Sequence, residues 1–273
     1  MTDAPIADRR ATPRTPPDRR THAREPFVEF RDISKAYGTK QVLRGANLTV
    51  YRGEVLVILG GSGTGKSVTL RHMLGLEAPD GGRVIVEEED ITDLPEEELY
   101  RVRKKFGMLF QSGALFDSMN VFENIAFPLR RHTKFTEQQI RERVDECLEL
   151  VHLPGVASKR PSELSGGMRR RVGFARAISL KPEILLFDEP TTGLDPVISD
   201  IIAELIVEMD RTLNTTTVTI THDMKVAFKI ADRIAMLYKG RIVEEGTPET
   251  FQQSQNPIVR QFIEGRAEGP LTE

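Results

Sequence analysis

Three short runs of mainly apolar residues occur along the chain, and each has the length of one buried β-strand. They are Val55–Leu59, Phe106–Phe110 and Ile184–Phe187. Apolar runs of this length are typical of strands that are buried on both faces of a parallel sheet. The first run is followed by a glycine-rich stretch and then by a helix that begins near Lys66. This order of strand, loop and helix predicts an α/β fold built on a parallel sheet.

Other hydrophobic patterns predict the elements around this sheet. Alternating apolar and polar positions predict strands at residues 27–30, 42–50, 83–87, 217–221, 233–238 and 241–245. A helical period predicts helices at residues 136–152, 165–180 and 200–213. We expect the last helix to bury Ile201, Ile202, Leu205, Ile206 and Met209.

Composition excludes some classes of protein. The 273 residues carry a net charge of -3, which argues against a general nucleic-acid binder, because such proteins are usually basic. Residues 1–26 are rich in proline and arginine, so we expect a disordered tail, with contact to anionic lipid as the functional alternative. No apolar run has the length of a membrane span, and the N-terminus has no apolar signal segment. We therefore expect a cytosolic protein unless a partner holds it at a membrane.

The stretch after the first apolar run fits the phosphate-binding pattern G-x-x-x-x-G-K-[ST]. It consists of Gly60, Gly61, Ser62, Gly63, Thr64, Gly65, Lys66 and Ser67. Glycines let successive backbone N–H groups point inward around phosphates, and the N-terminus of the following helix adds a favourable dipole. Lys66 is expected to reach the β- and γ-phosphates, and the Ser67 hydroxyl is expected to bind Mg²⁺.

Polar side chains at three other strand ends complete this predicted site. Asp188 is expected to hold Mg²⁺, and Glu189 is expected to polarise the water that attacks the γ-phosphate. Gln111 ends another strand and could face the same metal and water. His222 follows the strand at residues 217–221 and could contact the γ-phosphate. Taken singly, a glutamine or a histidine at a strand end is more often an ordinary residue without a role in a site.

A second glycine-rich turn is formed by Ser165, Gly166 and Gly167. Serine is a good helix N-cap, and the glycines leave backbone N–H groups free, so this helix N-terminus suits an anion. A capped helix alone does not explain two consecutive glycines, because each costs about 1 kcal/mol inside a helix. Three arginines, Arg169–Arg171, follow the turn. We expect one of them to reach an interface and the others to lie on a solvated helix face.

In this order, the motifs resemble those of the ATP-binding cassette (ABC) ATPases over residues 27–245. The resemblance rests on residues 60–67, Gln111, Leu164–Gly167, Asp188–Glu189, Gly193–Pro196 and His222. It implies a P-loop NTPase fold that binds ATP and Mg²⁺, with Lys66, Gln111, Glu189 and His222 as the catalytic residues. Ser67, Gln111 and Asp188 are then the Mg²⁺ ligands. The resemblance also implies that Tyr37 stacks on adenine and that Val68 belongs to the ATP-binding set.

The resemblance further implies a division of the chain and a partner copy. Residues 27–112 and 181–246 form a RecA-like core with an antiparallel β subdomain, and residues 113–180 form an inserted α-helical subdomain. Residues 247–273 form a C-terminal extension, which packs either on its own core or on a partner. In a head-to-tail homodimer, Ser165, Gly166 and Gly167 of one copy would cap the γ-phosphate held by the loop of the other. Either copy alone would then hold half of each site.

Within the family, the chain is most similar to the Mla/Mce-type lipid-transport ATPases of bacteria. Met168 stands where most members have glutamine, and Val68 stands where threonine is commoner; residues 113–130 and 259–270 also look like this subgroup. The resemblance implies a peripheral protein at the cytoplasmic face of the inner membrane. Its partners would be a permease, an MCE-domain lipid-binding protein and a small accessory subunit. The alternatives are the ATPase of another permease, such as a polar amino-acid importer, and an ABC ATPase without a transport role.

Overall fold

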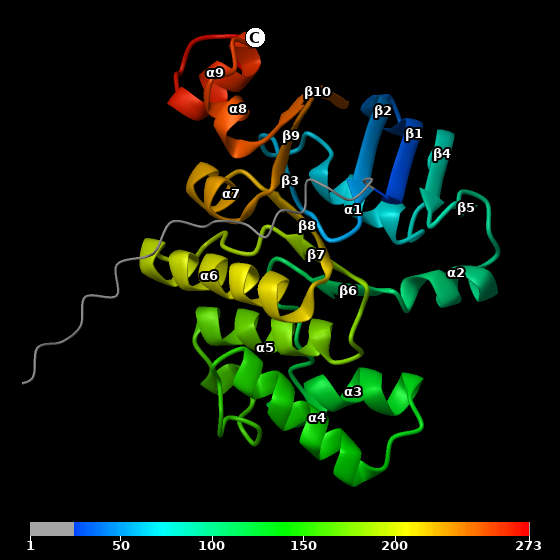
Figure 1. Ribbon diagram of the computed structural model, residues 1–273, viewed down its shortest axis with the longest axis vertical. Coiled ribbons are helices and arrows are strands. Elements are labelled where there is room, and N and C mark those ends of the chain that lie inside the picture. Colours follow the sequence, from blue (N-terminus) through cyan, green and yellow to red (C-terminus); the bar gives the residue numbers. More distant parts are fainter. Residues whose placement is uncertain (1–24, 273) are drawn as a thin grey trace, which may run out of the picture.

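The computed structural model describes residues 25–272, which form two β-sheets and a layer of helices. Figure 1 shows the smaller sheet beside the larger one, with α3 and α4 at the opposite end of the molecule from α8 and α9. The α/β architecture with a parallel central sheet is confirmed. Most of the predicted tail, residues 1–24, lies outside the described residues. Pro26, which we placed in the tail, belongs instead to the first strand, where it pairs with Tyr51.

The larger sheet has six strands in the order β10-β9-β3-β8-β7-β6. They are β10 (Arg241–Gly246), β9 (Arg233–Tyr238), β3 (Val55–Leu59), β8 (Thr216–Thr221), β7 (Ile184–Asp188) and β6 (Phe106–Leu109). All pairs are parallel except the antiparallel pair of β9 and β10. The carboxyl ends of β3, β6, β7 and β8 therefore meet at one edge, where ligands of open α/β sheets bind.

The smaller sheet is antiparallel, with the strand order β2-β1-β4-β5. Its strands are β1 (Pro26–Tyr37), β2 (Lys40–Tyr51), β4 (Gly81–Val86) and β5 (Glu89–Asp90). Its apolar face shares one hydrophobic core with α1 (Lys66–Met73) and with Leu56 and Ile58 of β3. The helix α1, which follows the phosphate-binding motif, is thus held between the two sheets.

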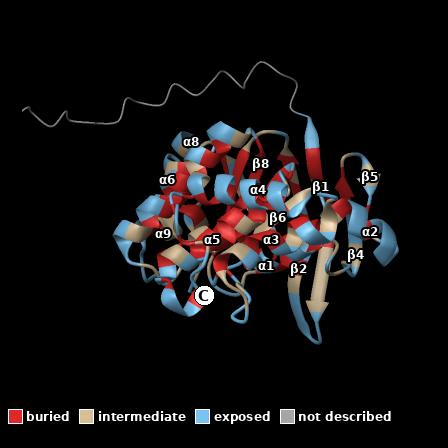
Figure 2. Ribbon diagram, turned by 90° about the horizontal axis from the view of Figure 1, so that it is seen from below, coloured by how far each residue is buried: buried red, intermediate tan, exposed pale blue. Residues whose placement is uncertain are grey.

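The helices α3 (Val121–His132), α4 (Glu137–Leu150) and α5 (Gly166–Ile178) form a layer that contacts α6 (Pro196–Leu213) and β6. Local sequence fixes where α3 and α4 begin, because Asn120 with Glu123 and Thr136 with Gln139 form capping boxes. A 3₁₀ turn at Pro161–Glu163 leads into α5. In Figure 2 the buried residues gather around α5 and the neighbouring strands. The expected inward position of Ile201 on α6 is wrong, since its side chain is exposed.

Three helices were not predicted from the sequence, and they are α2 (Glu96–Arg103), α3 and α7 (Met224–Ile230). The spacing of Phe251, Ile258, Phe262 and Ile263 predicts one amphipathic helix near the C-terminus, where the structure has two, α8 (Pro248–Gln252) and α9 (Pro257–Glu264). The last two belong to the C-terminal extension. The sequence is compatible with packing of this extension on its own chain or on a partner. In this structure Phe251 and Val259 are buried in the core of the same chain. The boundaries at residues 113, 181 and 247 stay predictions.

Candidate functional site

The loop between β3 and α1 is folded tightly around the amino group of Lys66. Lys66 is buried, and its Nζ donates to the carbonyl oxygens of Gly60 at 2.7 Å and Gly61 at 3.0 Å. Gly65 has a φ of 107°, which favours glycine, and a Cβ at Gly60 would lie 2.6 Å from the Leu237 carbonyl oxygen. The geometry therefore requires glycine at both ends of the loop.

Asp188 and Ser67 lie together at the adjoining ends of β7 and α1. The Ser67 hydroxyl donates to Asp188 Oδ1 at 3.2 Å. Burial raises the pKa of the Asp188 carboxyl, and the negative charge of Glu189 raises it further, against the opposing effects of Ser67 and Lys66. A desolvated carboxylate beside a hydroxyl is the kind of oxygen donor set that Mg²⁺ prefers. Asp188 and Ser67 thus fit the expected metal, and Gln111 lines the same cavity.

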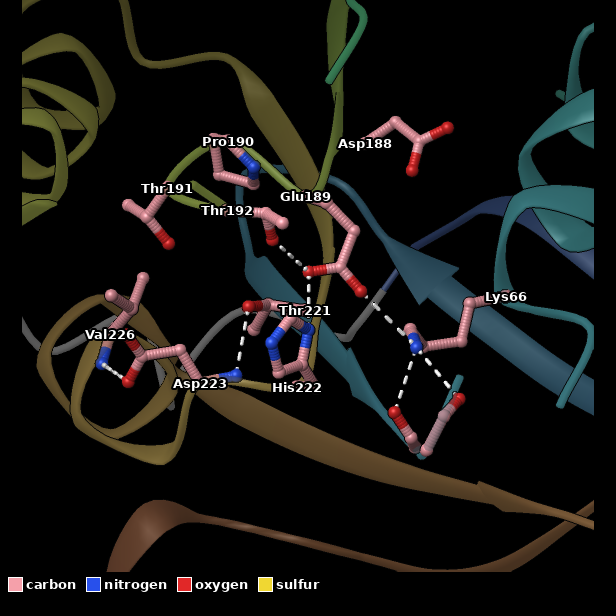
Figure 3. A network of polar contacts seen from close by, with 12 residues as sticks. Lys66, Asp188, Glu189, Pro190, Thr191, Thr192, Thr221, His222, Asp223 and Val226 are labelled. Carbon is pink, nitrogen blue, oxygen red and sulfur yellow. Dashed lines mark hydrogen bonds and ion pairs between the residues drawn. The ribbon is translucent and has the colours of Figure 1, made fainter. Parts of the chain in front are cut away.

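Glu189 connects three parts of the site (Figure 3). One carboxylate oxygen lies 3.2 Å from Lys66 Nζ, and the other accepts from Thr192 Oγ1 at 2.9 Å. His222 Nδ1 lies 2.9 Å from that second oxygen, so the hydrogen bond requires the proton on Nδ1. Only 12% of the Glu189 side chain is exposed. The carboxylate is therefore held by the phosphate loop, by the turn after β7 and by the end of β8.

A cavity of about 800 Å³ opens in front of these side chains. Among its lining residues are Lys66, Gln111, Asp188, Glu189 and His222. The tertiary structure thus brings together catalytic and metal-binding candidates that are far apart in the sequence. Gly61, Ser62, Gly63, Gly65, Ser67 and Val68 also line the cavity. Thr64 acts within the loop, where its hydroxyl donates to the Gly61 carbonyl oxygen at 3.0 Å.

Tyr37 is part of a polar cluster beside α1. Tyr37 is 42% exposed, and its hydroxyl donates to Glu77 Oε2 at 2.6 Å. Glu77 also pairs with Lys35 at 3.4 Å and with Arg71 at 3.6 Å. Arg71 lines the cavity, whereas Tyr37 is not one of its lining residues in the described part of the chain. Glu77 was not predicted from the sequence, since an isolated acidic residue carries no motif.

The turn formed by Ser165, Gly166 and Gly167 is absent from the lining of this cavity within residues 25–272. Ser165 caps α5, its hydroxyl oxygen accepting from the Met168 N–H at 3.2 Å. A Cβ at Gly167 would lie 2.6 Å from Ile198 Cγ2 of α6. At least one glycine of the pair therefore has a packing role that we did not expect. The turn therefore forms no part of the wall around this chain's own Lys66 among the described residues.

The arginines after the turn differ from expectation. Arg170 is buried, and it donates to main-chain carbonyl groups of the segment Glu189–Thr192. We expected one arginine at an interface and two on a solvated helix face, without saying which. Burial of Arg170 within its own chain fits neither place, while Arg169 is exposed. No sequence signal distinguishes the two, because both lie in a run of like residues whose burial depends on the packing of α5.

Comparison with known proteins agrees with this geometry. Residues 43–192 match the ABC transporter family. The chain is 43% identical to the intermembrane phospholipid transport system ATP-binding protein MlaF of Escherichia coli, over 90% of this chain and 91% of that protein. It is 44% identical to the probable ribonucleotide transport ATP-binding protein mkl of Mycobacterium tuberculosis, over 89% of this chain and 68% of that protein.

A solved structure shows the same fold in a dimer. It is an ATP-binding cassette in a post-hydrolysis state with ADP and phosphate. It has a TM-score of 0.75 and 32% identity, and the match covers 81% of this chain and 98% of that one. The fold, the cavity motifs and these similarities agree, and the chain belongs to the ABC transporter family of ATPases.

Proposed function

We propose that this chain is the ATP-hydrolysing subunit of a bacterial transporter that moves phospholipids between membranes. The observation that supports hydrolysis most directly is the position of Glu189, whose carboxylate lies between Lys66 and His222 at the mouth of the phosphate loop. Support for phospholipid as the cargo is the 43% identity to MlaF over 91% of its length. Transport direction and lipid species are not part of the proposal.

The residues of the cavity have different roles in the proposed hydrolysis. The backbone N–H groups of the loop and the Lys66 ammonium bind the phosphates, and Ser67, Asp188 and Gln111 would hold Mg²⁺. Bound Mg²⁺ neutralises charge on the phosphate oxygens. Glu189 accepts a proton from the attacking water, or orients that water, and His222 holds the carboxylate from the far side. Catalysis of this kind is mainly positioning and electrostatics.

Each ATP site is proposed to be completed by a second copy of the chain. The turn at Ser165, Gly166 and Gly167 is a capped helix N-terminus of the kind that binds anions, yet it is not part of the wall around Lys66. A head-to-tail homodimer places this turn over the nucleotide of the partner. Adenine then stacks on Tyr37, whose ring is half exposed beside α1.

The permease is proposed to contact the surface formed by residues 113–130. This surface carries Phe116 and Phe127, which are both exposed and whose rings lie 5.2 Å apart. A hollow beside them is lined by Ser118, Met119, Glu123, Phe127, Arg130 and Arg131. Aromatic residues, methionine and arginine are enriched at protein interfaces. Within the described residues no helix is long and apolar enough to cross a membrane.

We further propose that the permease holds the chain at the cytoplasmic face of the inner membrane. An MCE-domain lipid-binding protein and a small accessory subunit complete the system. The mkl similarity, at 44% identity, makes ribonucleotide the second candidate cargo. Purification of the detergent-solubilised complex distinguishes the two, because the phospholipid proposal requires co-purifying phospholipid and an MCE-domain protein. A complex that carries bound ribonucleotide cargo instead would favour the second candidate.

The substitution Glu189→Gln tests the catalytic proposal. The amide keeps the shape of the side chain but cannot accept the proton, so hydrolysis is expected to fall about 100-fold or more. ATP affinity is expected to remain near that of the wild type. Phosphate release and equilibrium ATP binding are the two measurements, with the exposed Glu142→Gln on α4 as the matched control. Undiminished turnover in the Glu189 variant would exclude this role.

A further inference from the structure

The three consecutive arginines of α5 have three different environments. Successive residues of a helix point about 100° apart, so one run of like side chains is divided among different faces. Arg169 is exposed. Arg171 donates to the carbonyl oxygens of Val151 and His152, at 3.5 Å and 3.2 Å. Arg170 points toward the turn that follows Glu189 and is only 8% exposed.

The guanidinium of Arg170 binds the backbone of the turn that follows Glu189. One terminal nitrogen donates to the carbonyl oxygens of Pro190 and, at 3.4 Å, Glu189, and the other donates to that of Thr192. All of these partners are main-chain carbonyls, and no carboxylate pairs with Arg170 among the described residues. Burial lowers its pKa, but an arginine stays protonated. The charge of the guanidinium is therefore compensated by main-chain carbonyl groups of a single turn.

The turn that Arg170 binds is a strained one. Glu189 has a φ of 49°, in the left-handed region that residues other than glycine rarely adopt. Such strain persists only where several contacts enforce it. Here the Glu189 N–H donates to the Ile220 carbonyl oxygen at 3.0 Å, Thr192 donates to the carboxylate, and Arg170 holds the carbonyls on the other side. The direction of the Glu189 side chain thus depends on the position of α5.

The N-terminus of the same helix is the turn at Ser165, Gly166 and Gly167. Ser165 and Arg170 are separated by little more than one helical turn, about 7 to 8 Å along the axis. The helix also contacts the segment after Gln111, because Arg176 donates to the carbonyl oxygens of Gly113 and Ala114 at 3.0 Å and 2.8 Å. One rigid helix is therefore bound to the turn at Ser165, to the segment after Gln111 and to the turn that carries Glu189.

We propose that Arg170 is a positioning residue that sets the carboxylate of Glu189 and links it to the turn at Ser165. This inference rests on the proposed function, in which that turn contacts the nucleotide of the partner copy. A shift of α5 when the partner's nucleotide binds is then passed through Arg170 to this chain's own Glu189. The fork geometry of arginine is needed, because a lysine ammonium is a single point charge that cannot bind the three carbonyl groups in the same way.

The test compares Arg170→Gln and Arg170→Lys with the matched control Arg171→Gln. For the Arg170 variants, kcat is expected to fall about 10- to 100-fold, because a misplacement of about 1 Å costs a factor of that size. Their ATP affinity is expected to stay within about twofold, since Lys66 and the loop are untouched. The Hill coefficient for ATP is expected to fall toward 1 as the link between the sites is lost. Arg171→Gln is expected to change none of these quantities.

Arg170→Lys keeps the buried charge, so it decides the question if the glutamine variant fails to fold. A folded Arg170→Lys variant with wild-type kcat would overturn the inference, as would an equal loss of kcat in Arg171→Gln. A reduced kcat with an unchanged Hill coefficient would overturn the link between the sites. If Glu189→Gln hydrolyses ATP normally, the proposed function itself fails. If Glu189→Gln is inactive while both Arg170 variants are fully active, only this inference fails.

Discussion

Asp188 and Glu189 are adjacent carboxylates whose surroundings give them different tasks. The Glu189 carboxylate is bound by Lys66, Thr192 and His222. Asp188 has the Ser67 hydroxyl as its side-chain partner, and burial raises its pKa. A carboxyl whose pKa is raised by folding destabilises the folded state wherever it is ionised. This cost is typical of functional sites, where a desolvated charge is kept for a ligand.

We expect Asp188→Asn to stabilise the nucleotide-free protein while abolishing Mg²⁺-dependent hydrolysis. At pH values above the raised pKa the folded state carries the full cost of the ionised carboxylate, and the amide removes that cost. As the pH falls through the raised pKa toward the unfolded value, the cost disappears and the two proteins converge. Melting temperatures at several pH values measure this, with the exposed Asp145→Asn as the control. A melting temperature at neutral pH that is equal to or below that of the wild type would contradict the expectation.

At the scale of elements, α5 contacts more of the site than any motif indicates. Its N-terminus packs on α6 through Gly167, its middle binds the turn after β7 through Arg170, and Arg176 binds the segment after β6. The sequence predicted the helix and its cap, because the Ser165 side chain and apolar spacing are local signals. It did not predict the close approach of Ile198 to Gly167, because that contact joins two elements.

We expect Gly167→Ala to destabilise the fold by about 1 to 3 kcal/mol, since the added methyl overlaps Ile198. Ile198→Ala removes the overlapping atom, so the double variant is expected to be more stable than the two single effects predict. Denaturant unfolding of the four proteins gives this interaction energy directly. If the two changes in unfolding free energy were strictly additive, Gly167 would not be required for packing. Its role would then lie in the N–H group that it leaves free.

At the scale of the whole molecule, the cavity around Lys66 and the turn at Ser165 are separate features of one chain. The cavity around Lys66 faces the carboxyl ends of the parallel strands, and the turn at Ser165 lies outside its lining among the described residues. The C-terminal extension adds to the same cavity, which is also lined by Gln261, Phe262 and Arg266. These residues lie next to the phosphate loop only because α9 packs back on the core of its own chain.

Mixing two inactive variants tests whether a second copy completes each site. Lys66→Ala damages the loop of its own copy, and Ser165→Arg damages the turn offered to the partner. Each variant alone is expected to be inactive. In a head-to-tail dimer of one copy of each, one site is intact, so an equal mixture should recover up to about a quarter of the wild-type rate. If both halves of a site came from one chain, every chain in the mixture would carry a defect, and no activity would return.

The sequence by itself determined the ATPase motifs, the class of fold and most of its strands. These signals are local, because each can be recognised from a few neighbouring residues. They are a glycine loop after a buried strand, carboxylates at a strand end and a serine at a helix start. Short helices such as α2 and α7 were missed, because one or two turns give too few apolar positions to show a period.

Tertiary structure alone decided which of three identical side chains reaches the turn that follows Glu189. Arg169, Arg170 and Arg171 are indistinguishable in sequence, and the packing of α5 between α6 and β6 leaves only Arg170 beside the Glu189 turn. The same holds for the polar contacts of Glu189, whose partners lie directly after β8, on the phosphate loop and in its own turn. Contacts between distant segments depend on how elements pack, and packing is a property of the folded chain as a whole.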